Sequence, residues 1–499
     1  MALWLALVLP DWPLQLALQG RPEKDDRPLV VSDGPAQRPW VVCADPAAQA
    51  LGIHAGQKLA AAKALASRLE IRTRDPARET SALGQLAAWA YQFSAHIVAR
   101  QANESGLLLE IGASLRLFDA SARTLAQDIH GGLSGLGIAA HQALAVTPRA
   151  AWWLACARAD GVSARDAPTP GELAEALEAL PLSVLGWDEK LVETLTTLGV
   201  RRIADVLRLP RAAFTRRFGA EPLAELARAR GEAPDPQPAY VAPEHFQAEL
   251  ELPADLIDAA QLARPAQRLL VLAEGWLRGR SALARRFRFA LKHSQRRGID
   301  RPATGLELAL ARPERDSLRL AALLAERLPR LELPAPAIAL SLIVEDCVAA
   351  ESETLALLAA TPELPGDWTA LAETLVARLG REHVFALEAC AEHRPELASR
   401  PRDCFAPPPP TANVPSTPRP LWLYRAPLAL GHSPAPEQPP AHGGALRLVA
   451  GPERIESGWW DGAPVARDYF VARNPRGQTF WIYRELAAPQ RWFVHGVFA

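Results

Sequence analysis

Three carboxylates close to apolar segments, Asp11, Glu110 and Asp119, are the residues whose type could support metal chemistry. Carboxylate oxygens are the ligands that hard divalent cations prefer. A metal site also needs its ligands to converge, and spacing along the chain does not establish convergence. We interpret the three as solvated loop or strand-end carboxylates, with a rebuilt metal site as the alternative.

A basic stretch from Leu277 to Ile299 contains eight Lys or Arg residues and no acid. Phe287, Phe289 and Leu291 alternate with cations in it, which is typical of a half-buried strand with a cationic outer face. We expect this face to contact DNA phosphates, each contact adding about 0.9 to the salt slope of binding. The alternative is a solvated basic face. The expected DNA-binding residues are Arg285, Arg286, Arg288, Lys292, Arg296 and Arg297.

An apolar island, Leu421-Trp422-Leu423, interrupts a segment in which 13 of the 40 residues from Pro401 to Pro440 are proline. Exposed apolar side chains in a linker favour docking into a pocket on a partner. The alternative is a strand that packs against the aromatic-rich tail, in which the turn Asn474-Pro475-Arg476-Gly477 predicts a β-hairpin.

Composition limits the class of protein. The 499 residues carry a formal net charge of −1, so DNA contact would need local basic patches. The apolar run at residues 1–10 is too short for a membrane span. The five cysteines form no C-x-x-C pair, which suits a reducing cytoplasm. The spacing of two histidines and two cysteines near residue 390 matches no compact zinc module; they are His383, Cys390, His393 and Cys404. We therefore expect neither a metal nor a cofactor.

The order of the helices and strands expected from the sequence predicts a multidomain α+β protein. Short apolar strands alternate with helices at first, an all-helical segment with Leu-Gly turns follows, and a second strand–helix unit precedes the prolines. We expect a first α/β domain at 1–165, a helical domain at 166–233, a second α/β domain at 240–350, a connecting segment at 351–400, a proline-rich linker at 401–442 and a β-rich tail at 443–499.

The opening segment Leu9-Pro10-Asp11-Trp12-Pro13, together with this order of elements, resembles Y-family (translesion) DNA polymerases over about residues 1–350. The domains would be palm and fingers, helix-hairpin-helix thumb, and little finger. More narrowly, the chain resembles the ImuB-type group, the catalytically degenerate members of bacterial mutagenesis cassettes. The other matching segments are His393-Arg394-Pro395-Glu396, Gly451-Pro452-Glu453-Arg454-Ile455, Trp459-Trp460, Val471-Ala472-Arg473-Asn474-Pro475-Arg476-Gly477 and Trp492-Phe493-Val494-His495-Gly496.

By this resemblance, the positions that hold the catalytic metals have lost their acids. Leu9 stands at the first acid of a D-x-D pattern, and Ser105 and Gly106 replace an Asp-Glu pair. Neither leucine nor glycine offers an oxygen ligand to a divalent cation. The resemblance therefore implies a polymerase-like protein that no longer polymerises, and the alternative is an active translesion polymerase with a displaced metal site.

Two segments that bind the triphosphate in active relatives are altered as well. Pro46 and Gln49 replace a Tyr and an Arg, and the stretch Gly137–Val146 lacks the lysines of the relatives. In the thumb, Asp188 stands where the second glycine of a phosphate-binding hairpin is expected, which should weaken phosphate contact.

The resemblance also implies the partners. We expect primer-template DNA, the polymerase sliding clamp bound through Leu421, Trp422 and Leu423, an error-prone C-family DNA polymerase and a RecA-like ImuA-type protein. In sliding-clamp-binding peptides a Gln precedes the apolar pair, and Pro418 occupies that position here. The chain would then be a non-catalytic scaffold in damage-induced error-prone synthesis.

Overall fold

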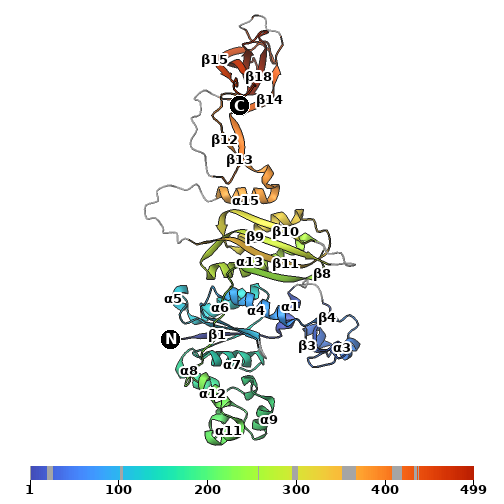
Figure 1. Cartoon of the computed structure of the whole chain (residues 1–499), viewed down its shortest axis with the longest axis vertical. Helices are drawn as coiled ribbons and strands as arrows, with labels where there is room; N and C mark the ends of the chain where they lie inside the picture. Colours follow the sequence, from blue (N-terminus) through green and yellow to red (C-terminus); the bar gives the residue numbers. More distant parts are fainter. Residues whose placement is uncertain are drawn as a thin grey trace. The chain divides into compact units, whose positions relative to one another are not determined.

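A computed structural model describes residues 2–19, 26–101, 105–256, 258–294, 302–350, 367–406, 419–431, 435 and 438–498. The chain forms two compact units, residues 1–366 and 367–499 (Figure 1). None of the helices in these ranges is both long and apolar enough to cross a bilayer.

The first unit is built around a four-stranded antiparallel sheet in the order β5-β6-β1-β7. Its strands are β1 (Trp4–Leu9), β5 (Ile97–Gln101), β6 (Ser105–Glu110) and β7 (His141–Ala145). The central strand β1 is apolar throughout because both of its faces are covered. Leu5, Leu7 and Leu9 pack toward α4 (Pro76–Ala90) and α6 (Ala122–Gly135), whereas Trp4, Ala6 and Val8 pack toward α7 (Pro148–Ala159), on the opposite side of the sheet (Figure 1).

A small three-stranded sheet, in the order β3-β2-β4, follows the first strand. It contains β2 (Leu29–Asp33), β3 (Trp40–Ala44) and β4 (Glu70–Thr73), with the short helices α1 (Trp12–Leu18), α2 (Pro46–Ala50) and α3 (Leu59–Leu65) beside it, while α5 (Leu115–Phe118) follows β6. Val30, Val41, Ile53 and Leu59 form its own small core.

The helical module, residues 166–233, packs on α7 and shares the core on that face of the sheet. It contains α8 (Pro170–Glu178), the 3₁₀ turn η1 (Leu182–Leu185), α9 (Glu189–Thr197), α10 (Ile203–Leu207), α11 (Arg211–Phe218) and α12 (Glu221–Ala229). Gly186 and Gly199 adopt positive φ values of 68° and 82° at the ends of η1 and α9, where glycine is the favoured residue.

A second sheet, in the order β10-β9-β11-β8, completes the described part of the first unit. Its strands are β8 (Phe246–Leu256), β9 (Ala282–His293), β10 (Thr304–Glu314) and β11 (Ala337–Ala349). The helices α13 (Ala263–Gly279) and α14 (Ser317–Arg327) lie on one face, with the turns η2 (Ala259–Leu262) and η3 (Leu328–Arg330) at helix ends.

The second unit begins with α15 (Asp367–Leu379), followed by η4 (Arg381–His383), η5 (Pro395–Leu397) and a two-stranded ribbon of β12 (Phe385–Ala389) and β13 (Ser399–Asp403). A five-stranded antiparallel sheet follows, in the order β14-β18-β17-β16-β15, which we call the tail sheet. Its strands are β14 (Trp422–Ala429), β15 (Arg447–Ser457), β16 (Val465–Arg473), β17 (Thr479–Glu485) and β18 (Trp492–Val497).

The expected linker at 401–442 differs from the structure at two places. The end of β13 falls inside it, and β14 is an edge strand of the tail sheet. Residues Trp422–Ala429 therefore belong to a sheet that begins before residue 443. The hairpin expected at Asn474–Gly477 is confirmed, because this turn joins β16 to β17.

Candidate functional site

The three positions at which the sequence predicts lost metal ligands meet at one end of the first sheet. Leu9 lies directly opposite Ser105, and its neighbour Val8 lies opposite Gly106. Leu9 is 1% exposed and belongs to the core under α4 and α6, whereas Ser105 is half-buried. A leucine in this core is explained by burial, and it offers no ligand to a cation.

Gly106 has no room for a side chain. A Cβ built on it would overlap the carbonyl oxygen of Leu7 and would approach Cη2 of Trp152 to 3.0 Å. Trp152, on α7, is 8% exposed and covers this face of β6. The guanidinium carbon of Arg100, on β5, lies 4.6 Å from the centre of the Trp152 ring, in cation–π geometry. The Trp152 indole and the Arg100 guanidinium therefore occupy the side of β6 toward which a side chain at position 106 would point.

The remaining carboxylates do not converge. Glu110 lies opposite Trp4 at one end of β1, whereas Asp11 lies two residues beyond Leu9, at the other end. Trp4 and Leu9 are themselves about 17 Å apart along the strand. The Glu110 carboxylate accepts hydrogen bonds from the backbone N–H groups of Leu3 (3.1 Å) and Gly112 (3.0 Å). Among the described residues, no group of three or more His, Cys, Asp or Glu side chains is arranged to hold a metal.

In the first of the two segments that bind the triphosphate in active relatives, the polar side chains make local hydrogen bonds. Asp45 caps α2 by accepting the Ala48 backbone N–H at 2.8 Å, and Gln49 donates its side-chain N–H to the Ala44 carbonyl at 2.8 Å. The second segment, Gly137–Val146, leads into β7 at the sheet edge. There Ala139 exchanges two backbone hydrogen bonds with the Gln15 side chain, at 3.0 and 2.8 Å. Asp45, Gln49 and the backbone of Ala139 are therefore engaged in local hydrogen bonds.

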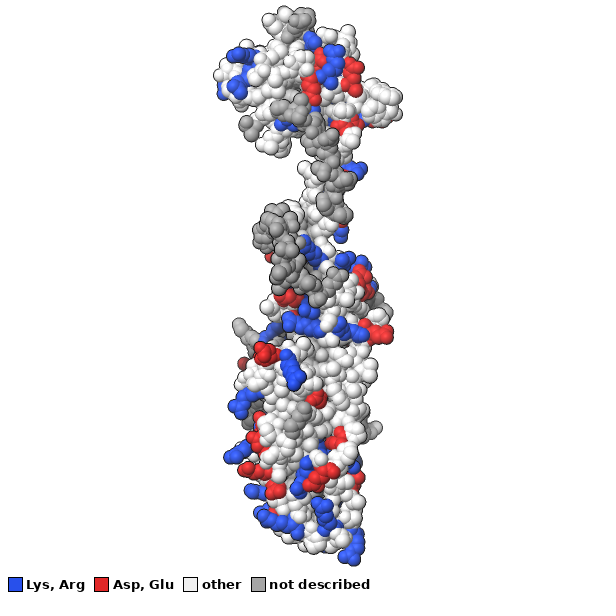
Figure 2. All heavy atoms as spheres, turned by 90° about the vertical axis from the view of Figure 1, so that its left-hand side faces the viewer, with Lys and Arg blue, Asp and Glu red and all other residues white. Residues whose placement is uncertain are grey.

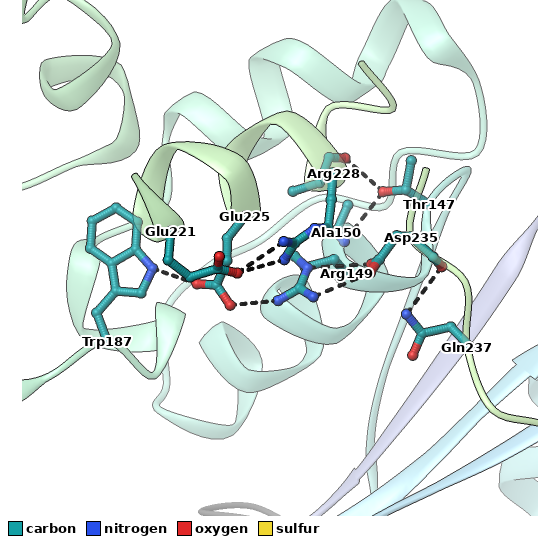
Figure 3. A network of polar contacts seen from close by, with 10 residues as sticks. Thr147, Arg149, Ala150, Trp187, Glu221, Glu225, Arg228, Asp235 and Gln237 are labelled. Atoms are coloured by element: carbon teal, nitrogen blue, oxygen red, sulfur yellow. Dashed lines mark hydrogen bonds and ion pairs between the residues drawn. The ribbon is translucent and has the colours of Figure 1, made fainter. Parts of the chain in front are cut away.

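A polar network centred on Arg149 was not predicted from the sequence (Figure 3). Arg149, in the first turn of α7, pairs with Glu225 of α12 at 2.8 Å and with Asp235 at 3.2 Å. Trp187 donates its indole N–H to Glu225 at 2.8 Å, and Thr147 donates its hydroxyl to the Ala229 carbonyl at 2.6 Å. The network ties the helical module to the first sheet. A cation in the first turn of a helix is disfavoured by the helix dipole, and that was the available signal that Arg149 needs acidic partners.

The basic strand folds with the predicted faces. In β9, Phe287, Phe289 and Leu291 are buried, while Arg286, Arg288 and Lys292 are exposed. Arg285 is exposed too, and Arg296 and Arg297 lie outside the described residues.

The neighbouring strands, however, supply acids that the stretch itself lacks. Arg286 lies 3.2 Å from Asp346, Lys292 lies 2.7 Å from Glu249, and Arg288 pairs with Glu345. The cationic outer face is therefore partly neutralised by acids of other strands, namely Glu307 of β10, Glu345 and Asp346 of β11, and Glu249 of β8. The visible face of the first unit likewise intersperses positive and negative side chains (Figure 2).

The helical module carries a less neutralised group of cations. Between Gly199 and Ala220 the chain has one acid, Asp205, which lies 3.7 Å from Arg208. We call the following exposed residues the arginine cluster: Arg201, Arg202, Arg208, Arg211, Arg216 and Arg217. Apart from Arg208, none of them has an ion pair with any described residue. Asp188 caps α9, accepting the backbone N–H groups of Lys190 (3.0 Å) and Leu191 (3.2 Å), so the hairpin donors expected for phosphate are already occupied.

Comparison with known proteins identifies the family. The family model described as impB/mucB/samB matches residues 11–154. Protein ImuB of Caulobacter vibrioides, in strains NA1000 / CB15N and ATCC 19089 / CIP 103742 / CB 15, is 30% identical over 483 residues, which cover 90% of this chain and 100% of the relative. This chain belongs to the ImuB family. The family predicted from the sequence motifs is thereby confirmed, and the match supports a role in mutagenesis or translesion synthesis.

Solved structures are similar over 70% of this ImuB-family chain and 99% of their own length. The crystal structure of DinB from Sulfolobus solfataricus is 16% identical with a TM-score of 0.37. The insertion ternary complex of Dbh DNA polymerase is 14% identical with a TM-score of 0.40.

The expected clamp-binding residues of the ImuB-family chain begin the edge strand β14. Trp422 pairs with Val497 and Leu423 with Gly496 of β18, so the segment is the strand that the sequence left as an alternative. The side chains of Leu421 and Trp422 are nevertheless 80% and 68% exposed. The segment therefore combines a fixed backbone with free apolar side chains.

Two tryptophans are exposed in the loop between β15 and β16. Trp459 and Trp460 are 80% and 58% exposed, although Arg394 nearby is only 4% exposed. Arg394 contacts Asp461 through both terminal nitrogens and lies 5.8 Å from the Trp460 ring centre. Hydrogen bonds from Arg394 lower the pKa of Glu392 to about 2. The segment around Arg394 thus holds the loop in place.

Proposed function

We propose that this chain is a non-catalytic scaffold in damage-induced, error-prone translesion DNA synthesis. The observation that supports this most strongly is the filled strand end, where Gly106 admits no side chain and Trp152 covers the adjacent face. Nucleotidyl transfer needs two divalent cations held by carboxylates, and Leu9, Ser105 and Gly106 supply none. The separation of Asp11 from Glu110 counts against the alternative of a displaced metal site.

A reconstituted bypass reaction tests the scaffold. The chain by itself should extend no primer, and it should increase extension past a template lesion by a separate error-prone C-family polymerase. Extension by that polymerase that is unchanged by the chain would contradict a scaffolding role. Extension by the chain alone would contradict the absence of catalysis.

We place the DNA contact on two cationic surfaces. One is the outer face of β9, with Arg285, Arg286, Arg288 and Lys292, where phosphates must compete with the carboxylates of neighbouring strands. The other is the arginine cluster, where little local charge needs to be displaced. Phosphate contacts release counterions, so the surface that binds DNA sets the salt dependence of affinity.

We propose that Leu421, Trp422 and Leu423 bind the sliding clamp. Because the backbone of this segment is already fixed in β14, binding would cost less conformational entropy than it would for a flexible peptide. Replacing Leu421 and Trp422 together by alanine should abolish capture of the purified clamp, because the two side chains are the apolar anchors. Undiminished capture would refute the assignment.

The proposed protein partners of the tail are an error-prone C-family polymerase and a RecA-like ImuA-type protein. Exposed tryptophans on a rigid loop are typical of residues that dominate interfaces, and the loop held by Arg394 presents two of them. Replacing Trp459 and Trp460 by alanine should remove co-purification of at least one partner while DNA binding persists. Retention of both partners would exclude this loop as their docking site.

A further inference from the structure

Two arginines face each other across the tail sheet, next to the turn that joins β16 to β17. Arg447 of β15 lies directly opposite Arg473 of β16, and Arg476 lies in the turn itself. All three residues are exposed, and none has an ion pair with any described residue. We call these three residues the tail arginines.

The other arginines of the same strands are each paired with an acid. Arg454 lies 2.8 Å and Arg484 lies 3.4 Å from the carboxylate of Asp468. Arg467 lies 3.0 Å from the carboxylate of Glu396. On β15, β16 and β17, the two arginines without an ion pair to a described residue are therefore the two that face each other.

This arrangement costs the tail sheet stability. Like charges directly opposite one another on neighbouring strands are destabilising, whereas opposite charges at such positions are favourable. The neighbouring stretches 441–450 and 471–482 contain no Asp or Glu that could relieve the repulsion. The folding of the sheet therefore does not explain the tail arginines, whereas a bound anion explains them.

The strand register places the two facing arginines on one side of the sheet. Arg473 lies opposite Thr479 of β17, so Arg447, Arg473 and Thr479 form one row across three strands. Residues directly opposite one another point to the same face, with Cβ atoms about 4.5–5.5 Å apart. Two guanidinium groups at this spacing can hold one phosphate between them or contact two successive phosphates of one strand.

The turn that carries Arg476 is held by local contacts. Asn474 is 4% exposed, and its side-chain oxygen accepts the backbone N–H groups of Arg476 and Gln478, each at 3.0 Å. The loop before β15 packs against this turn so closely that a Cβ on Gly444 would approach Cδ of Pro475 to 2.8 Å. Binding at the tail arginines therefore orders little backbone.

The surroundings of the tail arginines are unlike the centre of a protein interface, which is apolar and depleted of charge. Trp422 is exposed on β14, the strand at the opposite edge of the sheet. Trp459 and Trp460 are exposed at the other end of β15 and β16, about 27 Å away along the strands. On β15 itself, Val449 is the exposed large apolar residue. The tail arginines thus lack the aromatic anchors that a protein partner needs.

We infer that the tail arginines bind the phosphate backbone of DNA. Contacts to phosphate and sugar come from arginine and from neutral polar side chains, and Gln478 and Thr479 supply such side chains beside the tail arginines. The planar guanidinium fork matches phosphate oxygens. The inference rests on the proposed function for the identity of the anion and adds a DNA contact in the second unit. This contact lies at the opposite end of the strands from the Trp459–Trp460 loop, so a protein docked on that loop leaves it accessible.

The salt dependence of DNA affinity tests this site, measured by fluorescence anisotropy with the full chain and with a duplex and a single-stranded oligonucleotide. Replacing Arg447, Arg473 and Arg476 together by glutamine should reduce the salt slope by up to about 2.7 on the duplex or about 2.1 on the single strand, because each phosphate contact contributes about 0.9 or 0.7. A reduction confined to one oligonucleotide identifies the form of DNA that the tail binds. An unchanged slope with both would overturn the proposal.

Two single substitutions provide the matched comparison. Arg473→Gln should reduce the slope by about 0.7–0.9, as expected for the loss of one phosphate contact. Arg425→Gln removes the same charge from β14, at the opposite edge of the sheet, where Arg425 is exposed and has no ion pair with a described residue, and it should leave the slope unchanged. Equal reductions in both variants would show an effect of net charge alone and contradict a defined site.

The outcomes also separate this site from the DNA contacts proposed for the first unit. No DNA binding by the unaltered chain would overturn both. A slope reduced by replacing Arg216 and Arg217 but not by replacing the tail arginines would leave the first unit as the DNA-binding part. Loss of a protein partner from the triple variant with an unchanged slope would assign the tail arginines to that partner instead. The thermal unfolding midpoint of the triple variant should not fall, because the substitutions remove repulsion; a lower midpoint would show that the arginines stabilise the sheet and contradict the inference.

Discussion

Replacing Arg149 by methionine should destabilise the first unit by about 2–3 kcal/mol. The side chains of Arg149, Glu225 and Asp235 are 17%, 23% and 9% exposed, so two nearly buried carboxylates would lose their cation. Breaking a fully buried pair costs about 3–5 kcal/mol, and partial exposure reduces that value. Methionine keeps most of the side-chain volume, so the loss measures charge rather than packing.

Scanning calorimetry measures this effect. With an unfolding entropy of about 2.1 cal/mol/K per residue, a unit of this length loses about 1.3 °C for each kcal/mol, so the midpoint should fall by about 3–4 °C. Arg228→Gln is the matched control: its pair with Glu221 is 26% and 69% exposed and should be worth less than about 1 kcal/mol. Equal shifts in the two variants would refute the view that the Arg149 network fastens the helical module to the sheet.

Three further predictions follow from the described contacts. Gly106→Ala should reduce the free energy of unfolding of the first unit by about 1–3 kcal/mol, because the new Cβ would overlap the Leu7 carbonyl oxygen. Thermal unfolding measures this loss as a lower midpoint. An unchanged midpoint would show that β1 and β6 can move apart at little cost. Replacing Arg216 and Arg217 by glutamine should reduce the salt slope of duplex binding by up to about 2, and an unchanged slope would exclude them as phosphate contacts. Burial lowers the pKa of His495 below its usual 6.5, so the unfolded chain binds the extra proton and tail stability should fall as pH drops below about 6.5. His495→Gln should flatten that dependence, as followed by thermal unfolding at pH 5.5 and 7.5, and an equally steep dependence in the variant would assign it to another group.

The sequence predicted well those features that depend on local pattern. The alternation of Phe287, Phe289 and Leu291 determined the faces of β9, and the Asn474–Gly477 turn located a hairpin. The family resemblance assigned Leu9 and Ser105 to one lost metal site, and the two residues lie opposite each other at strand ends.

What the sequence could not predict depends on contacts between distant segments. The acids that neutralise β9 come from β8, β10 and β11, and the partners of Arg149 lie 76 and 86 residues further along the chain. The role of Trp152 follows only from its position over Gly106. The sequence offered β14 only as an alternative, because its pairing partner β18 lies at the opposite end of the tail sequence.

Primer extension by the purified chain, with Mg²⁺ or Mn²⁺ and all four nucleotides, tests the central claim most directly. DNA binding should be followed by fluorescence anisotropy in the same samples. Binding without extension is the predicted result, because Leu9, Ser105 and Gly106 do not supply the carboxylates that hold two divalent cations. Metal-dependent extension that scales with the chain itself and survives purification controls would contradict the account and make this protein an enzyme.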